Sequence, residues 1–187
     1  MDQNIQIIIK KIVKRAIDLY LKDKSILDID NEPFDNEYFD KKIGVFIEII
    51  DNNETILSLG NVEPELKILN NLIFVLISTI KYLDEQYVEK LKNNELTIKI
   101  WTINDYTNLK NKSEREKIHG ISSDKPGIVI TKNDKNTYCY LPSIWKETSD
   151  PIYILENLSL NANLDKDTWK ENDVDLIVFY PEVTIIN

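Results

Sequence analysis

Two pairs of apolar segments, each joined by a short polar turn, constrain the fold of this chain more than any other feature. The first pair spans 44–50 and 55–59, and the second spans 127–131 and 137–141. All four segments are rich in β-branched and aromatic side chains, and the residues between them contain asparagine and aspartate, which favour turns. The sequence therefore predicts two β-hairpins.

Segments with helical spacing lie around these hairpins. Apolar residues at intervals of three and four predict a helix over about 4–22 and another over about 64–83. The second is apolar around most of its circumference, so we expect it to be the buried central helix, and Pro64 suits its first turn. Asp150 before a proline resembles an N-cap and predicts a third helix over about 151–162.

The remaining segments complete the prediction of the fold class. A short helical turn is expected within 84–95, and strands are expected over 96–101 and 174–179. Strands separated by both hairpin turns and helices favour an α+β fold with a largely antiparallel sheet and packed helices. A doubly wound parallel sheet is disfavoured, because the chain contains no Gly-rich phosphate loop.

Length sets the expected domain organisation. The 187 residues suit a single domain over 1–187, although two packed lobes sharing one core would also fit. Residues 23–42 are expected to form a covering loop whose aromatic side chains pack onto the fold. Residues 104–126 are polar and charged, and we expect them to be the longest flexible stretch.

Charge and composition exclude several classes of protein. The formal net charge is −9, and Arg15 and Arg115 are the only arginines, which disfavours nucleic-acid binding. No apolar run approaches the roughly 18 residues of a membrane helix, and the amino terminus does not resemble a signal peptide. Cys139 is the only cysteine, so no internal disulfide can form, which fits a reducing compartment. We expect a cytoplasmic protein.

Few side chains are candidates for chemistry. His119, the only histidine, lies in a predicted loop and is either a general base or a solvent-facing residue. Cys139 lies in the middle of a predicted strand, where it is expected to pack rather than react. Glu63 and Glu65 are interpreted as acids at a helix terminus, with carboxylate catalysis as the alternative. With one histidine, one cysteine and no metal-ligand spacing, no metal or other cofactor is expected.

The order of these segments resembles the AMMECR1 family over nearly the whole chain. The matching pieces follow the family's patterns in the right order and at the right spacing. They are GVFI at 44–47, GNVEP at 60–64, PGIVI at 126–130, LP at 141–142, and LENL at 155–158 with Leu164 and Trp169. The resemblance implies the family's α+β fold, and the family's biochemical activity is unassigned.

The chain departs from this family at the polar positions. Counting back from Gly60, the R-G-C of the family's L-R-G-C-I-G signature falls on Ile56, Leu57 and Ser58. A charge, a glycine and a thiol are therefore replaced, while the apolar framework is kept. The family's D-P-R-F motif has no clear counterpart near 84–86.

Two functional hypotheses follow from this resemblance. The first is a non-catalytic module that binds a partner protein or a small ligand through a cleft near 58–63. The second is an enzyme or enzyme subunit associated with Memo-like or radical-SAM proteins, in which Ser58, Glu63 or His119 would have to act. The loss of the signature's polar residues favours the first. The candidate cleft residues are Ser58, Gly60, Asn61, Glu63 and His119, and Ser58 is expected close to the start of the helix predicted to open at Pro64.

Overall fold

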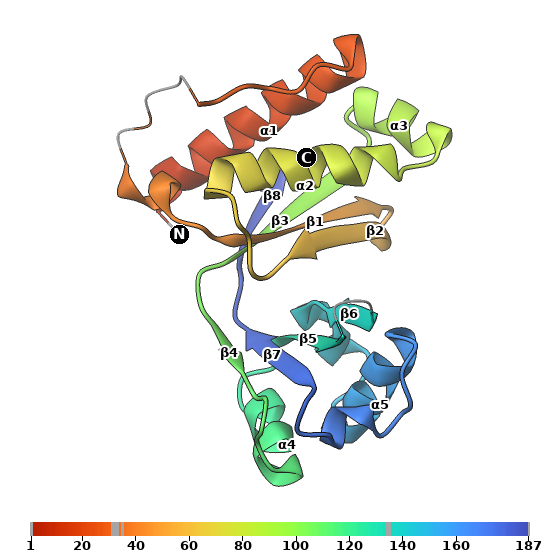
Figure 1. Cartoon of the computed structure of the whole chain (residues 1–187). Helices are drawn as coiled ribbons and strands as arrows, with labels where there is room; N and C mark the ends of the chain where they lie inside the picture. Colours follow the sequence, from red (N-terminus) through yellow and green to blue (C-terminus); the bar gives the residue numbers. More distant parts are fainter. Residues whose placement is uncertain (1, 31–33, 35, 134–135, 187) are drawn as a thin grey trace. The chain divides into compact units, whose positions relative to one another are not determined.

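The chain forms two compact units in a computed structural model (Figure 1). The structure describes residues 2–30, 34, 36–133 and 136–186. The first unit comprises the chain up to Asn104 together with the chain from Glu182 onward, and the second unit is Asp105–Pro181. Each unit is described by itself.

The first unit is built on an antiparallel sheet with the strand order β2-β1-β3-β8. The predicted first hairpin supplies β1 (Gly44–Asp51) and β2 (Glu54–Asn61). The other two strands are β3 (Thr97–Ile103) and β8 (Glu182–Ile186). The last strand of the sequence therefore returns to the first unit and pairs with β3.

Helices cover one face of this sheet (Figure 1). They are α1 (Gln3–Asp23) and α2 (Ile68–Lys81), with the shorter α3 (Glu85–Lys92) and the 3-10 helix η1 (Glu37–Asp40) beside them. Val45, Ile47 and Ile49 of β1 share a buried cluster with these helices. Because successive strand residues point to opposite faces, the intervening residues Phe46, Glu48 and Ile50 lie on the other face.

The second unit contains a second antiparallel sheet with the order β4-β7-β5-β6. Its buried cluster includes residues from strands β5 and β7 and from helix α5. The elements are β4 (Tyr106–Asn108), α4 (Glu114–Ser122), β5 (Gly127–Lys132), β6 (Asn136–Tyr140), η2 (Pro142–Lys146), α5 (Pro151–Asn161), η3 (Thr168–Lys170) and β7 (Asp175–Phe179).

The predicted fold class is confirmed. Both hairpins are present, and all strand pairs of the two sheets are antiparallel. The Asp150 side chain accepts hydrogen bonds from the backbone N–H groups of Ile152 and Tyr153, as its predicted N-cap role requires. Each unit contains one cluster of buried apolar residues.

The central helix is correctly predicted as the most buried one, but its start and its exposed side are not. In α2, 10 of 14 residues are buried, against 6 of 21 in α1. The helix begins at Ile68 instead of Pro64, and the Ile68 N–H donates to the carbonyl oxygen of Lys41. Phe74 is 60% exposed, because one side of the helix faces solvent.

The region 104–126 contains more regular secondary structure than the sequence predicted. It contains the short strand β4 and the helix α4. The helix begins with a capping box, in which Ser113 and Glu116 exchange hydrogen bonds between side chain and backbone. This S-x-x-E signal is present in the sequence, but the region was interpreted as a loop because the surrounding residues are polar and charged.

Candidate functional site

Ser58 lies in the middle of β2, exposed, on the face of the first sheet that the helices do not cover. Its register partner on β1 is Glu48. Residues paired directly across antiparallel strands point to the same face, so these two side chains are neighbours. No hydrogen bond of the Ser58 hydroxyl is found among the described residues.

Glu48 is a buried carboxylate that the sequence analysis did not single out. Its Oε1 accepts a hydrogen bond from the Thr55 hydroxyl at 2.6 Å, and its Oε2 accepts one from the Trp101 indole N–H at 3.0 Å. The Lys99 ammonium lies 3.9 Å from Oε2. Both carboxylate oxygens therefore have partners, as a buried charge requires. The only signal in the sequence is one glutamate among the apolar residues 44–50.

Gly60 is required by the close approach of β1. A Cβ at this position would lie 2.2 Å from the Val45 carbonyl oxygen and 2.5 Å from both the Cα and the ring Cγ of Phe46, its register partner. These distances are far shorter than van der Waals contact. The glycine therefore serves the packing of the hairpin.

Asn61 ends β2 and is held by a reciprocal amide pair with Asn71 of α2. The Asn61 amide donates to Asn71 Oδ1 at 2.9 Å, and the Asn71 amide donates to Asn61 Oδ1 at 3.0 Å. Asn71 also donates to the Ile43 carbonyl oxygen at 3.0 Å. Asn61 thus joins the end of the hairpin to the central helix.

Glu63 is exposed in the bend after β2. The interpretation of Glu63 and Glu65 as acids at a helix terminus is wrong, because α2 begins only at Ile68. Ser58 was expected close to the start of this helix. It lies inside β2 instead, and the helix begins only at Ile68. In the described part of the chain, the Glu63 carboxylate makes no hydrogen bond or ion pair.

His119 belongs to the second unit, whereas Ser58 and Glu63 belong to the first. The prediction that it lies in a loop is wrong, because α4 includes it, and its side chain is exposed.

Two residues earlier on this helix, Lys117 is fully buried. Its ammonium donates to the carbonyl oxygens of Trp169 at 2.9 Å and of Glu171 at 2.6 Å. Burial lowers the pKa of Lys117.

Cys139 lies in the middle of β6, as the sequence predicts, and it is partly exposed. The rings of its neighbours Tyr138 and Tyr140 pack edge to face with centroids 5.4 Å apart, so both lie on the opposite face. Burial of the sulfur raises the pKa of the Cys139 thiol far above its ordinary value. A protonated thiol is a poor nucleophile.

Two pockets lie wholly within the first unit, and none of the five candidate cleft residues lines either one. The smaller, of about 210 Å³, lies beside the start of α2. Its polar groups are already paired, since Asn70 donates to Asp30 at 2.9 Å and Lys67 contacts Asp40 at 2.6 Å. The larger has a volume of about 480 Å³ and lies between α1, α3 and the sheet.

Across residues 2–30, 34, 36–133 and 136–186, no group of three or more His, Cys, Asp or Glu side chains is placed to hold a metal ion. Over those same ranges, every helix is too short or too polar to cross a membrane.

Comparison with known proteins identifies the family. The family model described as AMMECR1 matches residues 10–184. The chain belongs to the AMMECR1 family. The resemblance inferred from the sequence motifs is thereby confirmed. No curated protein matches this AMMECR1 chain.

The fold of this AMMECR1 protein is also found in a solved structure. The crystal structure of uncharacterized protein PH0010 from Pyrococcus horikoshii is similar with a TM-score of 0.77 and 18% sequence identity. The similarity covers 94% of this chain and 88% of that chain. At this level of identity the likeness concerns the fold.

Proposed function

We propose that this AMMECR1 protein is a non-catalytic binding module, formed by one AMMECR1 domain over 1–187, whose partner protein or small ligand contacts the surface at Ser58–Glu63. The supporting observation is the division of roles along this segment. Gly60 and Asn61 fix the end of β2 against β1 and α2, while Ser58 and Glu63 stay exposed. A segment that is held by packing and hydrogen bonds and presents exposed polar groups suits recognition, because such preorganisation reduces the conformational entropy lost on binding.

The surroundings of Ser58 support binding over catalysis. A serine nucleophile needs a general base within hydrogen-bond reach. The neighbouring carboxylate of Glu48 instead accepts from Thr55 and Trp101. The alternative, an enzyme or subunit working with Memo-like or radical-SAM proteins, would need Ser58, Glu63 or His119 to act. In the described chain, neither Ser58 nor Glu63 hydrogen-bonds to a base.

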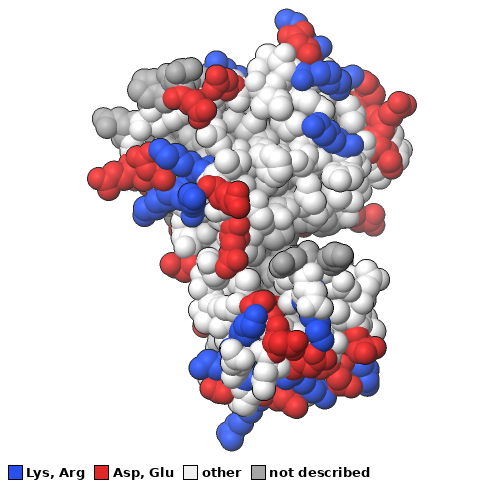
Figure 2. Space-filling view, in the orientation of Figure 1, with Lys and Arg blue, Asp and Glu red and all other residues white. Residues whose placement is uncertain are grey.

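The proposed setting is the cytoplasm, without contact to nucleic acid or membranes and without a bound cofactor. Figure 2 shows acidic and basic side chains interspersed on the visible face, with no continuous basic stripe across it. The formal net charge of −9 repels a phosphate backbone. The single cysteine fits a reducing compartment.

Affinity capture from the native host with quantitative mass spectrometry tests the proposal. Ser58→Arg places a long charged side chain on the proposed surface, and Ser25→Arg makes the same change at an exposed serine of the loop after α1. We expect molecules that are retained by wild type and by Ser25→Arg to be lost from Ser58→Arg. Retention of the same proteins and small molecules by all three forms would overturn the proposal.

A further inference from the structure

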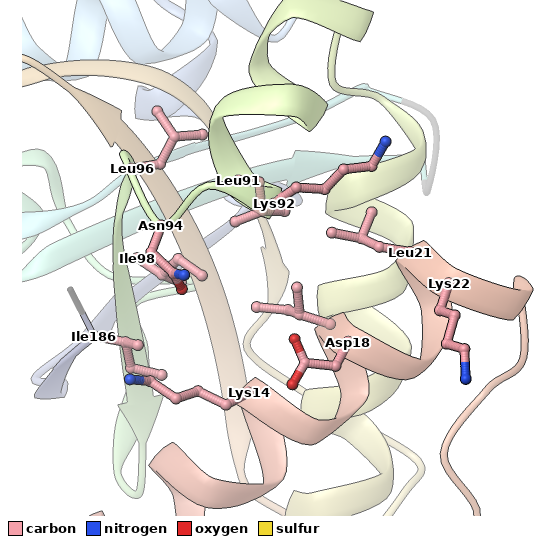
Figure 3. A pocket seen from close by; sticks show the side chains of 11 residues that line it. Lys14, Asp18, Leu21, Lys22, Leu91, Lys92, Asn94, Leu96, Ile98 and Ile186 are labelled. Atoms are coloured by element: carbon pink, nitrogen blue, oxygen red, sulfur yellow. The ribbon is translucent and has the colours of Figure 1, made fainter.

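The larger pocket of the first unit combines a buried apolar floor with charged groups at its rim (Figure 3). Its volume of about 480 Å³ lies within the range of roughly 300–1,000 Å³ that is usual for small-molecule sites. The floor is almost entirely buried and comes from α1, α3, β8 and the β3 region. Its residues are Ile17, Leu91, Leu96, Ile98 and Ile186.

The rim contains charges of both signs on one row of α1. Lys14, Asp18 and Lys22 are spaced four residues apart, so they lie along one face of the helix. In Figure 3 the carboxylate of Asp18 points into the pocket, and the side chain of Lys14 runs from α1 toward Ile186. The amino group of Lys22 points away from the pocket in the same view.

Lys14 and Asp18 are available to a ligand. In the part of the chain that the structure describes, neither side chain takes part in an ion pair or hydrogen bond. The order Lys before Asp is also the less favourable one for stabilising a helix, so the pair has little structural value. Lys92, at the opposite rim, is already paired with Glu89.

We propose that this pocket binds a small apolar zwitterion of about the size of a dipeptide. Its ammonium group contacts Asp18, its carboxylate contacts Lys14, and its apolar side chains cover the floor. A simple anion would be repelled by Asp18, and a simple cation would be repelled by Lys14. A zwitterion satisfies both charges.

The spacing of positions 14 and 18 on α1 suits a two-residue ligand. Positions four residues apart on a helix are separated by about 6 Å along its axis. Two extended residues span at most about 7 Å, so the terminal charges of a dipeptide can reach both groups. Asn94 also lines the pocket, and its side-chain amide can donate to and accept from the peptide group.

Calorimetric titration of the full chain with three matched probes tests the charge assignment. The probes are Leu-Leu, N-acetyl-Leu-Leu, which lacks the ammonium, and Leu-Leu-amide, which lacks the carboxylate. We expect saturable binding of Leu-Leu and weaker binding of the two blocked forms. No saturable binding of Leu-Leu, or equal binding of all three probes, would overturn the proposal.

Charge variants link each end of the ligand to one residue. Asp18→Asn should weaken Leu-Leu and Leu-Leu-amide about two- to fivefold, the range for exposed charge pairs, and should not weaken N-acetyl-Leu-Leu. Lys14→Gln should weaken Leu-Leu and N-acetyl-Leu-Leu by a similar factor and should not weaken Leu-Leu-amide. The reversed pattern, or no change in either variant, would show that the charges do not recognise the ligand.

A filled pocket provides the control for location. Leu21→Trp adds bulk at a half-buried residue that lines the pocket, whereas Leu19→Trp adds the same bulk to a half-buried residue of α1 outside it. We expect binding to be lost in Leu21→Trp and kept in Leu19→Trp, with the helical circular dichroism of both retained. Unchanged binding in Leu21→Trp would place the ligand elsewhere and overturn the proposal. Should Leu21→Trp fail to fold, the exposed charge variants still decide the matter.

Discussion

A single methyl group at position 60 does not fit between β1 and β2. The added Cβ would meet backbone atoms of Val45 and Phe46, which cannot move without disturbing the strand pairing. The glycine that the sequence analysis placed in a binding cleft thus has a packing role. Its neighbour Asn61 is likewise engaged, through Asn71. Ser58 and Glu63 are the residues of this segment that remain exposed.

Gly60→Ala should therefore destabilise the protein. Overpacking typically costs about 1–3 kcal/mol, and the short distances to backbone place this variant at the upper end. Ser58→Ala on the same strand is exposed and should change the free energy of unfolding by less than about 0.5 kcal/mol. Urea denaturation measures both. Equal stability of Gly60→Ala and wild type would mean that β1 and β2 are farther apart than described.

Trp101→Phe should destabilise the protein by removing the indole donor of the Glu48 carboxylate. An unsatisfied buried acceptor costs about 1–3 kcal/mol. Adding Glu48→Leu removes the carboxylate itself, so the loss in the double variant should be smaller than the sum of the two single losses. Urea denaturation of the four proteins in this cycle measures the coupling. Strict additivity would contradict the hydrogen bond.

At the scale of elements, α2 is amphipathic despite its apolar composition. Leu76 is completely buried, while Phe74 is 60% exposed on the solvent side. The polar residues Asn71 and Thr79, in contrast, are buried and make hydrogen bonds. In this helix some polar side chains are therefore buried while an aromatic one is exposed. Side-chain hydropathy alone therefore predicts the existence of this helix but not its orientation.

Truncation of these two α2 side chains should have unequal effects. Leu76→Ala should cost about 2–5 kcal/mol, the usual range for a core leucine. Phe74→Ala lies on the same helix and should cost less than about 0.5 kcal/mol, because its side chain gains little from folding. Chemical denaturation compares the two. A larger loss for Phe74→Ala would mean that the helix is rotated about its axis.

The capping box of α4 should make part of the stability depend on pH. Hydrogen bonds from Ser113, its side chain first and then its backbone, lower the pKa of Glu116 below its ordinary 4.5. A lowered folded-state pKa gives a contribution that is present above the unfolded-state pKa and lost as the pH falls through the folded-state value. The stability difference between wild type and Glu116→Gln should therefore shrink between pH 7 and about pH 3, below the ordinary carboxyl pKa.

Glu63→Gln provides the control for this measurement. Its carboxylate makes no hydrogen bond or ion pair in the described chain, so its replacement should have little effect at either pH. Urea unfolding at the two pH values gives the comparison. A difference between wild type and Glu116→Gln that stays constant over this pH range would contradict the capping box.

At the scale of the whole molecule, the sequence predicts local features better than distant ones. Both hairpins follow from neighbouring residues, and the N-cap at Asp150 follows from one dipeptide. In contrast, Trp101 lies 53 residues from Glu48, so no local pattern joins them. Strand β8 was missed because it pairs with β3, about 80 positions away. The larger pocket was missed for the same reason, since its walls come from segments that are far apart in the sequence.

Because each unit has its own hydrophobic cluster, we expect the two units to unfold locally to different extents when one cluster is weakened. Cys139 lies in β6 of the second unit, so its reactivity reports on the unfolding of that unit. Burial raises the pKa of its thiol, and the folded protein should therefore react slowly with a thiol reagent at neutral pH. Leu158 is fully buried in the second cluster, and Leu76 is fully buried in the first. Each truncation should weaken mainly the unit whose cluster it belongs to.

Leu158→Ala should accordingly accelerate the labelling of Cys139 more than Leu76→Ala does. A core truncation of about 2–5 kcal/mol corresponds to an increase of about tenfold or more in the opening of the affected unit. The equal chemical size of the two changes makes each variant the control for the other. Labelling rates in buffer without denaturant, with circular dichroism to verify folding, provide the measurement. Equal acceleration by both variants would show that the two clusters stabilise one cooperative unit, because loss of packing in either would then open β6 to the same extent.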